Sequence, residues 1–115
     1  MKALVVEDEA LIRLNLCDML EELGIATEQA ANGKDGLAAL ESDGTFDLLV
    51  ADLGLHGMSG DELVRRAHAL KPGLKIIVAS GRSASAIADL IAATGARFLG
   101  KPFDFDDLRR AVEGA

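Results

Sequence analysis

Residues 3–8 read Ala3-Leu4-Val5-Val6-Glu7-Asp8, so a short apolar run leads directly into two acidic residues. Similar runs lead into Asp52 and, at residues 96–100, into Lys101. Short runs rich in Val, Ile and Leu are typical of strands covered on both faces of a parallel sheet. The carboxyl ends of such strands form the ligand-binding edge. We therefore expect these three carboxylates and the lysine to lie together at one edge of a sheet.

Apolar runs alternate with helical patterns five times along the chain. We predict strands at Lys2–Val6, Ile25–Ala30, Asp47–Ala51, Lys75–Ala79 and Arg97–Gly100. We predict helices at Glu9–Leu23, Lys34–Ser42, Gly60–Leu70, Ala84–Thr94 and Phe105–Glu113. Gly24 and Gly95 follow the first and fourth helical patterns, as helix-terminating glycines commonly do. Regular alternation predicts an α/β fold with a parallel sheet, right-handed crossovers and helices on both faces.

The composition is that of one globular domain, which we place at residues 1–115 and expect to be a stand-alone domain. A net charge of -7 and a pI near 4.7 argue against nucleic acid and anionic membranes as partners. No stretch resembles a signal peptide or a membrane span. A single cysteine cannot form an intramolecular disulfide, which favours a cytoplasmic location.

The first helical pattern has one apolar face, formed by Ile12, Leu16, Met19, Leu20 and Leu23. Cys17 falls outside this face. We therefore expect Cys17 to be a partly exposed thiol of ordinary reactivity.

Three carboxylates at one sheet edge repel one another unless a cation lies among them. Mg²⁺ suits such a place, because it prefers oxygen ligands and keeps several waters that phosphate oxygens can replace. We therefore expect Mg²⁺ as the cofactor of this edge.

Four segments of the chain, in this order and spacing, form a highly specific pattern. They are Val5-Val6-Glu7-Asp8-Glu9, residues 49–60 (Leu49-Val50-Ala51-Asp52-Leu53-Gly54-Leu55, then Gly57-Met58-Ser59-Gly60), Ala79-Ser80-Gly81 and Lys101-Pro102-Phe103. On the strength of these segments, the chain resembles the receiver domains of bacterial two-component response regulators. The resemblance covers its whole length. The resemblance implies a flavodoxin-like (βα)5 doubly wound sandwich, with a five-stranded parallel sheet in the order 2-1-3-4-5.

The resemblance also implies the roles of the residues at the sheet edge. Asp52 would accept phosphate and form an acyl phosphate, a reaction in which a carboxylate needs no activating base. Asp8 would bind Mg²⁺ directly, Glu7 would act through water, and the backbone carbonyl of Gly54 would be a further ligand. Lys101 would pair with the phosphoryl group, whose transfer depends mainly on positioning and charge neutralisation.

A second group of positions matches the conformational switch of the family. Ser80 would bind a phosphoryl oxygen through its hydroxyl, and Phe98 would turn inward when that hydroxyl moves. A fixed core position for Phe98 is the alternative. The Lys101–Pro102 bond matches a cis peptide.

Two residues leave their roles open. His56 stands where the family often has proline, and we interpret it as a solvated loop residue rather than a ligand or base. Arg82 lies two residues after Ser80 and either reaches towards the phosphate or is simply exposed.

These expectations combine into a signalling function, with catalysis limited to the domain's own phosphorylation and dephosphorylation. A histidine kinase or a histidine phosphotransfer protein would supply the phosphate. The signal would leave through a face built from the fourth helix, the fifth strand and the fifth helix, towards a protein target or a second copy in a homodimer. Candidate residues of this face, some of which must be core, are Ile87, Leu90, Ile91, Arg97 and Leu99.

There are three alternatives, of which the first would share the strand and helix order. A flavodoxin-like cofactor binder is disfavoured because acidic residues 7–9 would repel phosphate in the first loop and because the chain has no Trp or Tyr to stack on a flavin. An aspartyl-phosphate phosphatase would need a cap or a dedicated general acid, and neither is visible. A receiver that only binds partners would not require the Asp52 and Lys101 pair.

Overall fold

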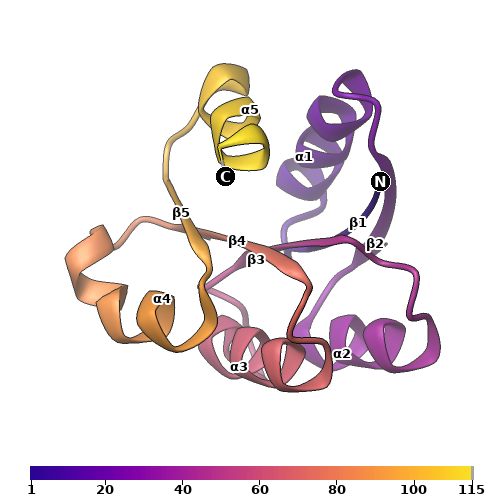
Figure 1. Cartoon of the computed structure of the whole chain (residues 1–115). Coiled ribbons are helices and arrows are strands. Elements are labelled where there is room, and N and C mark those ends of the chain that lie inside the picture. The colour runs from indigo at the N-terminus through magenta and orange to yellow at the C-terminus, as the bar shows by residue number, and fades with distance from the viewer. Residues whose placement is uncertain (115) are drawn as a thin grey trace.

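Five parallel strands form one sheet in the order β2-β1-β3-β4-β5 in the computed structural model, which describes residues 1–114 (Figure 1). The strands are β1 (Lys2–Val6), β2 (Ala26–Ala30), β3 (Leu48–Asp52), β4 (Lys75–Ser80) and β5 (Arg97–Gly100). The chain passes from β1 to β2 on one side and from β2 back across β1 to β3 on the other. This reversal is the topological switch point where α/β sheets bind ligands. The predicted fold class and strand order are confirmed.

Helices cover both faces of the sheet. They are α1 (Ala10–Glu22), α2 (Gly33–Ser42), α3 (Gly60–Leu70), α4 (Ala88–Thr94) and α5 (Phe105–Glu113). Figure 1 shows α1 and α5 on one face and α2, α3 and α4 on the other. Within residues 1–114, no helix is both long enough and apolar enough to cross a lipid bilayer.

The core has two halves because successive side chains of a strand point to opposite faces. On β1, Leu4 and Val6 pack into the half beneath α2, α3 and α4, whereas Ala3 and Val5 pack into the half beneath α1 and α5. The central strands are thus buried on both sides. This burial explains why their sequences are continuously apolar rather than alternating.

The fourth predicted helix consists of two parts. A 3-10 turn covers Ala84–Ile87, and α4 then runs from Ala88 to Thr94. The Ser83 hydroxyl accepts a hydrogen bond from the Ala86 N–H at 3.3 Å, which stabilises the tight turn locally. The helix ends at Gly95, whose φ of +69° lies in the left-handed region that favours glycine, as the sequence predicts.

The expectation for Cys17 is wrong. Its side chain is buried, at 3% relative exposure, in the same cluster as Leu16, Leu20 and Ile25. The reason is that α1 packs against β2 as well as β1, so its buried arc is wider than the apolar face predicted from the sequence. Burial raises the pKa of the Cys17 thiol, so this thiol is less reactive than an exposed one.

Candidate functional site

The sheet brings the predicted site residues together at the carboxyl ends of its strands. Hydrogen bonds of the sheet continue just beyond the strands: the N–H of Leu53 donates to the Ala79 carbonyl at 3.1 Å, and the N–H of Lys101 donates to the Ser80 carbonyl at 2.9 Å. These bonds fix the backbone of β3, β4 and the start of the loop after β5 relative to one another. Asp52 is the last residue of β3 and Ser80 the last residue of β4.

Glu7, Asp8 and Asp52 form the acidic cluster. One carboxylate oxygen from each lies within 4.8 Å of the others. Glu7 is 1% exposed and Asp52 is 8% exposed, whereas Asp8 is half-buried. Carboxylate oxygens are the donors that Mg²⁺ prefers, so this donor set fits the expected metal ion.

Lys101 supplies the positive charge next to the acidic cluster. Its Nζ lies 2.9 Å from Asp52 Oδ1 and 3.6 Å from Glu7 Oε1. Burial opposes the charge on the ammonium group, but the hydrogen bond to Asp52 and the charges of Asp52 and Glu7 outweigh it and raise the pKa of Lys101. Lys101 therefore stays protonated at neutral pH. The Lys101–Pro102 peptide bond is cis.

Negative charge exceeds positive charge in this buried space. Burial raises the pKa of Glu7 to about 7, and the negative charge of Asp52 acts in the same direction. A hydrogen bond from the Glu9 N–H to Glu7 Oε2, at 3.3 Å, partly offsets this effect. One ammonium group does not neutralise three carboxylates, so a divalent cation would relieve the remaining repulsion.

Asp8 has a neighbour that the sequence analysis missed. His56 Nδ1 lies 2.6 Å from Asp8 Oδ2, although the imidazole is 95% exposed. The hydrogen bond to His56 lowers the pKa of Asp8. The only signal in the sequence is that both residues follow strands that turn out to be neighbours, β1 and β3.

The two residues assigned to the switch lie on the adjacent strands β4 and β5. Ser80 is buried, and its Oγ accepts a hydrogen bond from the Arg82 N–H at 2.9 Å. Phe98 is half-buried and packs against the core half beneath α2, α3 and α4. The ring lies so close to Gly100 that a Cβ there would be 3.1 Å from it.

An open hollow of about 490 Å³ lies over Asp52, and we call it the Asp52 hollow. Its lining residues are Asp52, Leu53, Gly54, Asp61, Ser80, Gly81, Arg82 and Lys101. Gly54 donates its N–H to Asp52 Oδ1 at 3.2 Å. The arrangement offers a carboxylate nucleophile, a cation beside it and hydroxyl and guanidinium donors around an accessible space.

The family model of the response regulator receiver domain matches residues 3–113. The chain belongs to this family. The receiver domain is 34% identical over 113 residues to the response regulator receiver protein CpdR of Brucella abortus, covering 97% of the chain and 93% of CpdR. It is 36% identical over 109 residues to the two-component response regulator PhoP of Pseudomonas aeruginosa, covering 94% of the chain but only 48% of PhoP.

The receiver domain also superposes on solved structures of the family. The response regulator protein TrrA of Thermotoga maritima, solved in complex with Mg²⁺-BeF, matches with a TM-score of 0.88 and 31% identity. That match covers 98% of this chain and 96% of TrrA. The likeness therefore extends over the sheet, all five helices and the strand ends that carry the site.

Proposed function

We propose that Asp52 accepts phosphate from a histidine kinase or a histidine phosphotransfer protein, in a reaction that requires Mg²⁺. The observation that carries this proposal is the contact between Asp52 and Lys101, at 2.9 Å, beside two further carboxylates. Family membership and the Mg²⁺-BeF complex of TrrA support it.

The hydrogen bonds of Asp52 leave one of its two carboxylate oxygens free to attack phosphorus. Within residues 1–114 both bonds to its carboxylate, from Gly54 N–H and Lys101 Nζ, go to Oδ1. Oδ2 keeps its lone pairs for a new bond. In the proposed step a carboxylate oxygen bonds to phosphorus while the bond from phosphorus to the donor nitrogen breaks, and that nitrogen keeps the electron pair.

Positioning and charge neutralisation together supply most of the catalysis in phosphoryl transfer. Asp8, Asp52 and the Gly54 carbonyl would hold Mg²⁺ directly and Glu7 would hold it through water, and the bound ion would neutralise charge on phosphoryl oxygens. Lys101 would stabilise a further oxygen, and the Ser80 hydroxyl would donate a hydrogen bond to another. Water would later attack the phosphorus of the acyl phosphate and reset the domain.

Phosphate uptake tests the proposal directly. Incubation with Mg²⁺ and a small phosphodonor should add one phosphate, measured as intact mass, and Asp52→Asn should add none. Asp43→Asn is a matched control, because Asp43 also lies within hydrogen-bonding distance of a lysine, 2.6 Å from Lys2, but outside the site. Equal phosphate uptake by Asp52→Asn would contradict the assignment.

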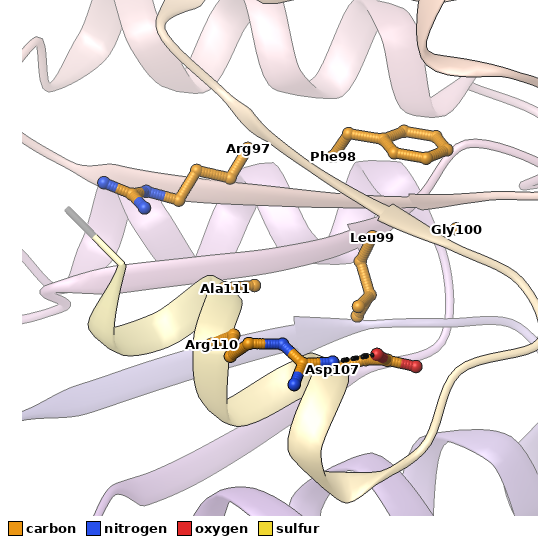
Figure 2. A pocket seen from close by; sticks show the side chains of 7 residues that line it. All are labelled: Arg97, Phe98, Leu99, Gly100, Asp107, Arg110 and Ala111. Carbon is orange, nitrogen blue, oxygen red and sulfur yellow. Dashed lines mark hydrogen bonds and ion pairs between the residues drawn. The ribbon is translucent and has the colours of Figure 1, made fainter.

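For the output we propose the face of α4, β5 and α5. Figure 2 shows Leu99 pointing towards α5, whereas Phe98 lies on the other side of β5. A groove in this face is lined by Arg97, Phe98, Leu99, Gly100, Asp107, Arg110 and Ala111. Of the five candidate residues, Ile87, Leu90 and Leu99 are almost fully buried, so Ile91 and Arg97 present most of the exposed surface to a partner.

Ser80 and Phe98 connect the site to this face. Ser80 ends β4 and leads into the loop before α4, and Phe98 lies on β5, so movement of both would remodel the surface. Ser80→Ala should still take up phosphate but should transmit the signal poorly. Amide exchange with and without beryllium fluoride should change protection between Ser83 and Phe103. Changes restricted to the neighbourhood of Asp52 would contradict this output surface.

A further inference from the structure

Arg82 and Asp61 meet across the Asp52 hollow from different elements. Arg82 lies in the loop after β4, and Asp61 lies in the first turn of α3. The Arg82 Nη2 is 3.0 Å from Asp61 Oδ1, and both residues line the hollow together with Asp52, Ser80 and Lys101. The proposed roles of the site residues do not explain this ion pair.

The backbone of Arg82 is also tied to the site. Its N–H donates to Ser80 Oγ at 2.9 Å. If the Ser80 hydroxyl turns to bind a phosphoryl oxygen, the Arg82 N–H loses this acceptor. The main chain and the side chain of Arg82 are therefore both held by groups that line the hollow.

The ion pair is of a kind that a stronger anion can replace. It is a single contact, and the side chains of Arg82 and Asp61 are 49% and 39% exposed. Exposed ion pairs of this type are weak. A phosphoryl group carries more charge and more acceptor oxygens than a carboxylate, and the planar guanidinium matches its geometry.

The space between Asp52 and the mouth of the hollow is open on the side of Gly54. Gly54 has no side chain, and a Cβ at this position would lie 3.6 Å from an Asp52 carboxylate oxygen. A phosphoryl group on Asp52 would therefore meet no side chain of residue 54 between it and the part of the hollow that Arg82 lines.

We infer that Arg82 is a phosphoryl-binding residue that Asp61 holds in the unphosphorylated domain, and that a phosphoryl group on Asp52 replaces Asp61 as its partner. This inference rests on the proposed phosphorylation of Asp52. The exchange releases Asp61 of α3 and moves the loop that leads to α4. Asp61 thus competes with the phosphoryl group for Arg82 and limits how tightly the site holds it.

Binding of beryllium fluoride at saturating Mg²⁺ tests the exchange, with the apparent Kd followed by amide resonances in NMR spectra. We expect Arg82→Gln to weaken binding about three- to tenfold and Asp61→Asn to tighten it about two- to fivefold. Glu62→Gln is the matched control, because it removes the same charge from the neighbouring residue, whose partner is Arg66 at 3.0 Å. It should change the Kd by less than about 1.5-fold.

The double variant separates the exchange from a simple effect of charge. In the Arg82→Gln background, Asp61→Asn should change the Kd no more than Glu62→Gln does. The Arg82 Nε–H resonance of the wild type should shift on addition of beryllium fluoride, and in Asp61→Asn it should start from a different position.

Each contrary result has a distinct meaning. An unchanged Kd in Arg82→Gln, or an equal effect of Asp61→Asn with and without Arg82, would overturn the inference while the proposed function stands. Failure of the wild type to bind beryllium fluoride or to be phosphorylated at Asp52 would overturn the proposed function and this inference with it.

Discussion

Two lysines at opposite ends of the strands have nearly the same contacts. At the amino end, Lys2 Nζ lies 2.6 Å from Asp43 and 3.6 Å from Glu28. At the carboxyl end, Lys101 Nζ lies 2.9 Å from Asp52 and 3.6 Å from Glu7. The two lysine side chains are 29% and 30% exposed. We call the first group, Lys2, Glu28 and Asp43, the Lys2 cluster, and the second group, Lys101, Glu7 and Asp52, the Lys101 cluster.

The carboxylates of the two clusters differ in their burial. The side chains of Asp43 and Glu28 are 32% and 52% exposed, whereas those of Asp52 and Glu7 are 10% and 1% exposed. The hydrogen bond from Lys2 lowers the pKa of Asp43, but burial raises the pKa of Glu7 to about 7. The same pattern of contacts therefore stabilises one end of the sheet and stores unfavourable charge at the other. Such stored charge favours binding of a cation.

The largest difference should appear when each lysine is removed. Lys101→Ala should lower the rate of phosphate uptake by roughly 100-fold, because a preorganised positive charge beside Asp52 is lost. Lys2→Ala should leave the rate unchanged and should only lower the melting temperature slightly. Uptake measured by intact mass over time distinguishes the two. A similar loss of rate in both variants would mean that each lysine affects phosphate uptake only through the stability of the fold.

Mg²⁺ should act on one end of the sheet only. At about ten times its Kd, Mg²⁺ should raise the melting temperature by on the order of 5 °C, because it binds only the folded state. Asp8→Ala should remove most of this increase, and Asp43→Ala should keep it. An unchanged Mg²⁺ response in Asp8→Ala would count against the acidic cluster as the metal site.

The two clusters should respond to pH with opposite signs. The pKa of Glu7 is about 7 in the folded domain, whereas the ordinary pKa of a glutamate, which applies to the unfolded chain, is 4.5. The folded state therefore binds more protons between these values, and metal-free protein should lose stability as pH rises from 4.5 to 7, by at most on the order of 3 kcal/mol. Asp43, whose pKa is lowered, contributes stability above its unfolded value of 3.8 and loses it as pH falls below that value.

Urea unfolding in the presence of a chelator measures both effects. The difference in unfolding free energy between Glu7→Gln and the wild type should increase from pH 4.5 to pH 7. The difference between the wild type and Asp43→Asn should be constant across that range and shrink only in acid. If the difference in unfolding free energy between Glu7→Gln and the wild type did not change with pH, folding would not disfavour the charged form of Glu7.

Parallel topology explains why the sequence predicts so much of the site. In a parallel sheet the carboxyl ends of all strands lie at one edge. The residues that end or follow the apolar runs, Glu7, Asp52 and Lys101, could therefore be placed at that edge from the sequence alone. The strand boundaries agree within one residue; for example, β3 runs to Asp52 rather than Ala51. Apolar runs and terminating glycines encode these features locally.

Contacts between residues outside the sheet leave no such pattern. The pairs of Asp8 with His56 and of Asp61 with Arg82 join residues 48 and 21 positions apart, and neither pair follows a helical or strand period. The burial of Cys17 depends on how β2 lies against α1, which a helical pattern alone does not specify. The 3-10 turn before α4 depends on the Ser83 cap, whose hydroxyl would also fit an α-helix.

The smallest effect should come from His56, which tests whether exposure or location decides the behaviour of a charged contact. His56 contacts Asp8 at the functional end, yet its imidazole is 95% exposed, which is more than any side chain of the Lys2 cluster or the Lys101 cluster. Exposed contacts of this kind are weak. We therefore expect His56→Ala to tighten Mg²⁺ binding less than about threefold, because it removes the imidazole from Asp8 Oδ2 but keeps the weaker backbone N–H contact of residue 56 at 3.4 Å. Amide resonances of residues 7–9 during a Mg²⁺ titration measure this change. A change of tenfold or more would mean that location at the acidic cluster outweighs exposure, and that His56 controls the carboxylate on which the metal site depends.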